Sequence, residues 1–155
     1  MRAIVTGASG LLGRAVYKAF REAGHEVTGL AKSRAKNGLR QFDLTDKDKL
    51  DALIQELKPD AERRPDVAEK NREATFELNV NVPAHIASLS KAYNILFIQI
   101  STDYVFDGKN PPYDVNDKPN PLNFYVIMNN AGNHFTSGET KYQGELAVQN
   151  ANRQA

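Results

Sequence analysis

Apolar and polar residues alternate along the first part of the chain in a pattern that predicts strands and helices in turn. The short apolar run Arg2 to Val5 stops before a glycine, as a buried strand does. Apolar side chains then recur at helical spacing from Gly10 to Ala23, and Gly24 ends the helix. Two further short strands are expected at 25–31 and 39–44. Strands that alternate with helices are typical of a parallel α/β sheet.

The middle of the chain is mostly helical in pattern. Leucine and isoleucine side chains at i, i+3, i+4 and i+7 predict an amphipathic helix that Thr45 or Asp46 caps and that ends at Pro59. Helical patterning resumes over 65–92 in two pieces. Pro83 is compatible with this only in the first turn of the second piece, because proline lacks the N–H that a helix interior needs.

The later part supplies one more strand and one more helix. The run 94–100 is almost entirely apolar, which predicts a central strand. A loop rich in proline, asparagine and aspartate is expected at 108–123, and a helix at 140–150. The order of elements indicates an α/β fold with a Rossmann-like, doubly wound parallel sheet.

One strand of that sheet is missing from the pattern. After Pro59 a parallel sheet should continue with a strand, but residues 60–66 contain neither a β-branched nor an aromatic side chain. We therefore expect the sheet to lack one central strand. The neighbouring strands would then leave a gap or pair directly with each other.

Composition excludes several classes of protein. A chain of 155 residues is long enough for one domain with a core. Its net charge of +1 gives no reason to expect a nucleic acid or an anionic membrane as partner. The absence of cysteine excludes disulfides, and no apolar run is long enough to span a membrane. The three histidines do not cluster, so no metal site is expected. A chain without cysteine fits a reducing compartment, and we expect a cytoplasmic location.

The stretch TGASGLLGR predicts a phosphate-binding turn. Gly7, Gly10 and Gly13 allow, in order, a tight turn, close approach of backbone to a pyrophosphate, and close packing of helix on strand. The helix that follows presents its N–H groups and the positive end of its dipole. The candidate cofactor-binding residues of this stretch are Gly7, Ser9, Gly10, Leu11, Leu12 and Gly13.

The end of the second strand favours one cofactor over another. An acidic residue there would bind the adenosine ribose hydroxyls of NAD, but the chain has Lys32 and Arg34, which favour the 2′-phosphate of NADP(H) over NAD(H). Asp43 and Leu44, after the third strand, lie where a carboxylate could meet an adenine amino group. A turn or helix-capping role for Asp43 is an open alternative.

Four stretches, TGASGLLGR, STDYVFDG, PLNFY and TKYQGE, give the chain a family resemblance. In this order they resemble the extended short-chain dehydrogenases/reductases of the dTDP-4-dehydrorhamnose reductase type. Within that group, AERRPDV and NPPY look most like the regulatory beta subunits of methionine adenosyltransferase. The resemblance implies a methionine adenosyltransferase catalytic subunit as partner. It also implies that residues 1–155 form one NAD(P)-binding Rossmann-like domain and that the family's C-terminal substrate domain is absent.

The resemblance also implies three catalytic residues. Tyr125 matches the tyrosine that donates a proton to a carbonyl, Thr102 the hydroxyl that orients it, and Lys141 the lysine of the family pattern Tyr-x-x-x-Lys. Here Lys141 follows Tyr125 by 16 positions. Removing the 12 residues 126–137 restores the pattern, so we expect an insertion that displaces the lysine.

Three interpretations of the chain therefore stay open. The first is an NADP(H)-binding regulatory subunit of methionine adenosyltransferase without catalytic turnover. The second is an NADPH-dependent reductase of a 4-keto sugar nucleotide, which Thr102 and Tyr125 favour and the displaced Lys141 opposes. The third is a truncated or mis-spliced product without function, which the insertion, the missing strand and the missing C-terminal domain would explain together.

Overall fold

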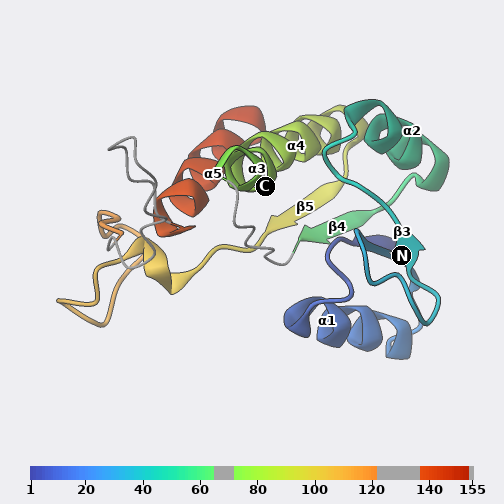
Figure 1. Cartoon of the computed structure of the whole chain (residues 1–155), viewed down its shortest axis with the longest axis horizontal. Helices are drawn as coiled ribbons and strands as arrows, with labels where there is room; N and C mark the ends of the chain where they lie inside the picture. Colours follow the sequence, from blue (N-terminus) through green and yellow to red (C-terminus); the bar gives the residue numbers. More distant parts are fainter. Residues whose placement is uncertain (65–71, 122–136, 154–155) are drawn as a thin grey trace.

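The computed structural model describes residues 1–64, 72–121 and 137–153 (Figure 1). Its strands are β1 (Arg2–Val5), β2 (Glu26–Ala31), β3 (Arg40–Gln41), β4 (Ala61–Arg64) and β5 (Leu96–Gln99). Its α-helices are α1 (Leu11–Glu22), α2 (Lys47–Leu57), α3 (Arg72–Phe76), α4 (Val82–Tyr93) and α5 (Ser137–Ala151). A π-helical turn, η1 (Glu77–Asn81), joins α3 to α4, and a 3₁₀ turn, η2 (Asp103–Val105), follows β5.

The five strands form one parallel sheet in the order β3-β2-β1-β4-β5. Helix α1 covers one face, and α2, α4 and α5 lie on the other (Figure 1). Helices on both faces of a parallel sheet define the doubly wound Rossmann-like architecture, so the predicted fold class is confirmed.

The prediction that a central strand is missing is wrong. Residues Ala61–Arg64 form β4, which lies between β1 and β5 and pairs with both, for example Ala61 with Ala3 and with Leu96. Asp60 sets this register, because its N–H donates to the Arg2 carbonyl (2.7 Å) and its carbonyl accepts from the Leu96 N–H (3.0 Å). The two neighbouring strands provide hydrogen-bond partners for the backbone N–H and C=O groups of β4. These hydrogen bonds outweigh the low β-propensity of the sequence AERR.

Two apolar clusters hold the layers together. The larger lies between the sheet and the helices α2, α4 and α5, and includes Ile4, Leu53, Ile86 and Phe97. The smaller centres on Val5, Ala8 and Val16, under α1. A core on each face fixes the carboxyl ends of the strands along one edge, where ligands bind in sheets of this type.

Local capping explains the helix limits. Of the two predicted caps for α2, Asp46 is the one used: its carboxylate accepts from the Lys49 N–H at 3.2 Å. Lys58 ends α2 in the left-handed conformation, and Pro83 lies in the first turn of α4, as expected. None of the helices among the described residues is long and apolar enough to cross a membrane.

Candidate functional site

The turn after β1 has the geometry that the glycine spacing predicts. Gly7 has a φ of 62°, in the left-handed region that glycine adopts without a steric penalty. The Gly10 N–H donates to the Gly7 carbonyl at 2.9 Å. A Cβ added to Gly13 would lie 2.8 Å from the Gly7 carbonyl carbon and 3.0 Å from Ala8 Cα. The absence of a side chain at Gly13 therefore lets α1 start directly against the turn.

The first turn of α1 is open to an anion. Gly10 is the N-cap, no side chain caps the helix, and its first turn contains no acidic residue. Ser9 is half-buried, whereas Leu11 and Leu12 are 85% and 42% exposed. The first N–H groups of a helix have no partner within it, and together with the helix dipole they attract negative charge. The residues present thus fit a pyrophosphate at this position.

An ion pair joins the segments that follow β2 and β3. Lys32 Nζ lies 3.5 Å from Asp43 Oδ2. Asp43 also accepts hydrogen bonds from the N–H (3.1 Å) and the hydroxyl (2.8 Å) of Thr45. Burial by itself would raise the pKa of the Asp43 carboxyl, but the Thr45 hydrogen bonds and the Lys32 ammonium together hold that pKa below its ordinary value. Asp43 is therefore a turn-forming carboxylate, one of the roles that the sequence left open.

Arg34 and Leu44 have different surroundings. Arg34 is exposed and makes no ion pair within the part of the chain that the structure describes. Leu44 is half-buried and packs against the larger apolar cluster. Arg34 is thus accessible to an anion, whereas Leu44 also supports the core.

Lys141 lies at the carboxyl end of β5. Its side chain is 4% exposed, and its Nζ donates to the Ile100 carbonyl at 3.4 Å. Thr102, two residues further on, donates its hydroxyl hydrogen to Asp103 (3.2 Å) and accepts from the Tyr104 N–H (3.3 Å). The structure therefore brings two of the three predicted catalytic residues, Thr102 and Lys141, to the segment after β5.

A second contact ties α5 to the same segment. The Ser101 hydroxyl donates to the Glu145 carboxylate, one helical turn beyond Lys141. Beside this pair is a hollow of about 610 Å³ whose lining includes Thr102, Tyr142 and Leu146. A hollow of this size at the carboxyl end of the strands is where a small ligand fits in this type of sheet.

Asn79, in the π-helical turn η1, is a residue that sequence reasoning missed. Its side chain is 3% exposed, and its Nδ2 donates to the Thr140 hydroxyl of α5 at 3.1 Å. A Cβ on Gly144 would lie 3.2 Å from the Asn79 carbonyl carbon and closer still to the oxygen. Turns of this type occur often at functional sites. The signal in the sequence was an asparagine between apolar residues in the middle of a predicted helix.

The third predicted catalytic residue, Tyr125, lies outside the described residues. The same holds for residues 126–136 of the expected insertion, whereas its last residue, Ser137, opens α5. The displacement of Lys141 from Tyr125 therefore stays a prediction from the sequence. Within the described ranges, no three His, Asp or Glu side chains gather as a metal site would require.

The loop after β5 is organised by one carboxylate. Asp107 accepts from the Lys109 N–H (3.0 Å), the Tyr113 hydroxyl (2.9 Å) and the Asn120 amide (3.0 Å). These bonds, led by the one from Lys109, hold the pKa of Asp107 below its ordinary value. Phe106 stacks on Tyr113 with ring centroids 4.3 Å apart. The loop beside Thr102 is therefore held in one shape by its own side chains.

A curated protein similar to this chain is methionine adenosyltransferase 2 subunit beta from Danio rerio. It is 44% identical over 153 residues, an alignment that covers 95% of this chain and 43% of the zebrafish protein. The chain thus spans less than half the length of this relative.

Two solved structures with the same fold carry the name dTDP-4-dehydrorhamnose reductase. A hypothetical dTDP-4-dehydrorhamnose reductase from Sulfolobus tokodaii superimposes with a TM-score of 0.80 at 31% identity, covering 95% of this chain and 51% of that one. A dTDP-4-dehydrorhamnose reductase from Bacillus anthracis in complex with NADP gives 0.78 at 26% identity, covering 99% and 50%. Both resemblances expected from the sequence are confirmed. Because the profile of the family described as the RmlD substrate binding domain matches residues 1–155, the chain belongs to that family.

Proposed function

We propose that this chain is the NADP(H)-binding part of a reductase-like regulatory subunit of methionine adenosyltransferase, and thus serves S-adenosylmethionine biosynthesis without reductase turnover. The observation that carries the proposal is the 44% identity to a methionine adenosyltransferase beta subunit over 95% of the chain. Residues 1–155 act in this proposal as one dinucleotide-binding domain in the cytoplasm. The 16 positions between Tyr125 and Lys141 support the lack of turnover.

The turn after β1 supports the cofactor part of the proposal. Gly7, Gly10 and Gly13 leave room for a pyrophosphate against backbone, and the uncapped start of α1 attracts its charge. The residues that would hold the pyrophosphate are those from Ser9 to Leu12. Lys32 and Arg34 would favour the 2′-phosphate of NADP(H), and Asp43 with Leu44 would lie near the adenine. A similar reductase of known structure was solved in complex with NADP.

Thermal unfolding tests the cofactor. A ligand at 100 times its dissociation constant adds about 2.7 kcal/mol to the stability of the folded state. For a domain of this size that is a rise in Tm of roughly 5–11 °C. We expect a cooperative transition that rises with NADPH and rises less with NADH. A broad transition that responds to neither dinucleotide would support the third interpretation, a truncated or mis-spliced product without function.

Co-purification tests the partner. The tagged protein should retain a methionine adenosyltransferase catalytic subunit on an affinity column, and a matched column without the tagged protein serves as the control. Passage of the catalytic subunit through the wild-type column would contradict the regulatory function while leaving the cofactor result intact.

The placement of Lys141 favours a second function, reduction of a 4-keto sugar nucleotide. Its Nζ lies 3.4 Å from the carbonyl of Ile100, two residues before Thr102, although Lys141 is far from Tyr125 in the sequence. The cofactor, when bound, supplies the hydride to the carbonyl carbon. In this function Tyr125 donates the proton, Lys141 stabilises the tyrosinate, and Thr102 orients the carbonyl.

Steady-state kinetics separate the two functions. The wild-type protein and a variant that lacks residues 126–137 are assayed for NADPH oxidation with a 4-keto sugar nucleotide, with Tyr125→Phe as the negative control. The regulatory function predicts no turnover by wild type. Turnover by wild type that Tyr125→Phe abolishes would establish the reductase instead.

A further inference from the structure

Asn37 and Gly38 form the only Asn-Gly pair in the sequence, and they lie at the tip of the turn between β2 and β3. Their φ values are 57° and 83°, so both residues are in the left-handed region. The Leu39 N–H donates to the Lys36 carbonyl at 3.2 Å and closes this two-residue turn. Asparagine followed by glycine is the preferred sequence of such a turn, because both residues tolerate a positive φ.

We propose that this pair is a site of spontaneous covalent modification, at which Asn37 loses its side-chain amide as ammonia and becomes aspartate or isoaspartate. The inference goes beyond the proposed function and does not depend on it, because the reaction needs only water and the chain itself. No enzyme, metal or oxidant takes part in it.

The reaction has two steps, cyclisation and hydrolysis. The Gly38 backbone nitrogen loses its proton and attacks Cγ of Asn37, so that an N–Cγ bond forms. The Cγ–Nδ2 bond breaks, and the departing nitrogen takes up a proton and leaves as ammonia. Water then opens the cyclic succinimide at either of its carbonyl carbons. One product is aspartate, and the other is isoaspartate, in which the main chain runs through the former side-chain carbonyl.

The surroundings of the pair leave this reaction unhindered. Asn37 and Gly38 are both exposed. Among the residues that the structure describes, neither the Asn37 amide nor the Gly38 N–H has a hydrogen-bond partner. Apart from its chain neighbours, the atom nearest to a Cβ built on Gly38 is the Tyr17 hydroxyl oxygen, 4.0 Å away. An exposed turn closed by one backbone hydrogen bond opens at low free-energy cost, and opening lets the nitrogen reach Cγ.

Asn94 provides a contrast within the same chain. It is also exposed and left-handed, with a φ of 54°. The next residue, however, is Ile95, whose N–H donates to the Ser90 carbonyl at 2.8 Å and whose branched side chain is buried. The nitrogen that would attack Asn94 is therefore held by the end of α4. The two asparagines share exposure and backbone conformation, and they differ in the availability of the next nitrogen.

Asp107 and Gly108 could form the same ring, but the carboxyl carbon of Asp107 is a poorer target. Its carboxylate accepts three hydrogen bonds from neighbouring residues of the loop. These bonds hold the pKa of Asp107 below its ordinary value, so the group is ionised at neutral pH. An ionised carboxylate resists attack by a nitrogen nucleophile. We therefore expect Asp107 to persist where Asn37 reacts.

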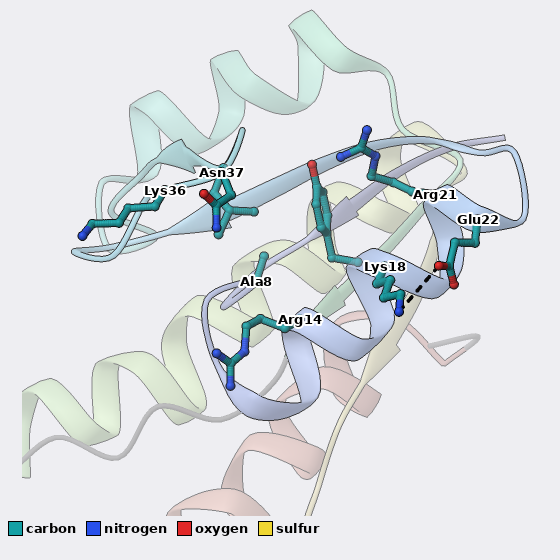
Figure 2. A pocket seen from close by; sticks show the side chains of 9 residues that line it. Ala8, Arg14, Lys18, Arg21, Glu22, Lys36 and Asn37 are labelled. Atoms are coloured by element: carbon teal, nitrogen blue, oxygen red, sulfur yellow. Dashed lines mark ion pairs between the residues drawn. The ribbon is translucent and has the colours of Figure 1, made fainter.

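The products change the charge of a second hollow, which lies between α1 and the segment that follows β2 (Figure 2). Its volume is about 620 Å³, and Asn37 is part of its lining, next to Lys36 and opposite α1. Four cationic side chains and one carboxylate also line it: Arg14, Lys18, Arg21, Lys36 and Glu22. Either product places a new carboxylate in this cationic hollow, where the neighbouring positive charges stabilise it.

Isoaspartate also changes the backbone. It adds one atom to the main chain between Lys36 and Leu39, so their hydrogen bond of 3.2 Å cannot keep its geometry. Strand β3 begins at the next residue, Arg40, which pairs with Leu30 of β2. Because β3 has only 2 residues and lies at the edge of the sheet, a longer turn before it should weaken this pairing. The modified protein should therefore unfold at a lower temperature than the fresh protein.

Peptide mapping of the aged protein tests the inference. The purified chain is incubated at neutral and at mildly alkaline pH, and samples taken over time are digested and analysed by mass spectrometry. Chromatography separates the aspartate peptide from the isoaspartate peptide, and released ammonia is measured in parallel. The matched variant is Asn37→Gln, whose longer side chain would have to close a larger ring that forms more slowly. Circular dichroism during heating checks that the variant is folded before incubation.

The expected result is conversion of Asn37 in the folded protein at a rate about tenfold or more above that of Asn94. The rate should rise with pH, because the Gly38 nitrogen must lose its proton before it attacks. The Asn37→Gln variant should keep the mass of this peptide and its melting temperature through the same incubation. Asn37→Asp introduces the charge without the longer backbone, so it should melt closer to fresh wild type than the isoaspartate form does.

Two outcomes would overturn the inference. If Asn37 stays intact in the folded protein but converts when the protein is unfolded in urea, the turn protects the pair. If Asn94 converts as fast as Asn37, the structure around Gly38 has no influence on the reaction. Neither outcome bears on the cofactor or the partner, which have separate tests.

Discussion

The substitution Gly13→Ala tests whether the start of α1 requires a glycine. A Cβ there would lie 2.8 Å from the Gly7 carbonyl carbon and 3.0 Å from Ala8 Cα, and closest of all to the Gly7 oxygen. These are backbone atoms, which cannot rotate away, so either α1 or the turn must move.

The magnitude follows from two opposing effects. Overpacking a well-packed site costs typically about 1–3 kcal/mol, and alanine in place of glycine gains roughly 1 kcal/mol in helix propensity. Because the clash is with backbone, we place the overpacking cost in the upper part of its range and expect a net loss of about 1–2 kcal/mol. For a domain of this size each kcal/mol lowers Tm by about 2–4 °C, so a fall of roughly 2–8 °C is expected.

The assay is circular dichroism during heating, with and without NADPH. Gly10→Ala is the matched control, since its Cβ would meet the Gly7 oxygen at 3.2 Å, a contact that a small shift relieves. Gly13→Ala should lower Tm more than Gly10→Ala and should lose most of the rise that NADPH gives to wild type, because the N–H groups of α1 move away from the pyrophosphate. A Gly13→Ala variant with the Tm of wild type and the full NADPH response would refute this reasoning.

Three further experiments probe other parts of the structure by substitution. Gly144→Ala should separate α5 from η1 and lower the free energy of unfolding by about 1–3 kcal/mol in urea, because its Cβ meets the Asn79 carbonyl; an unchanged midpoint would contradict this. Asn79→Ala should cost about 1–3 kcal/mol in the same assay, because it leaves the buried Thr140 hydroxyl without this amide donor, and Thr140→Val in that background should recover part of the loss. The pKa of Asp43 is lowered in the folded protein, so its ionised carboxylate stabilises the fold at pH values above the ordinary pKa of about 3.9. This contribution disappears as the pH falls through the lower pKa of the folded protein. Urea unfolding at several pH values should therefore show Asp43→Asn less stable than wild type at pH 7, with the difference shrinking below about pH 4; a constant difference would argue against the shift.

The elements that the sequence predicts well are those held by local interactions. The apolar run Arg2–Val5 is β1 with the same limits, and the helix expected from Gly10 to Ala23 is α1, Leu11–Glu22. Asp46 caps α2 through a hydrogen bond to a residue three positions away. Such features depend on neighbours in the chain, so the pattern of residue types is enough to predict them.

Other features depend on partners far away in the chain. Strand β4 forms from AERR because β1 and β5 supply hydrogen-bond partners on both sides, a context that β-propensity does not contain. Lys141 reaches the Ile100 carbonyl, 41 positions earlier, because α5 packs on η1 through Gly144 and Asn79. Residue types and their spacing are therefore enough to predict the glycine turn, the helices and the family. The central strand and the position of Lys141 could not be predicted in this way, because both follow from pairing and packing between segments that are far apart in the chain.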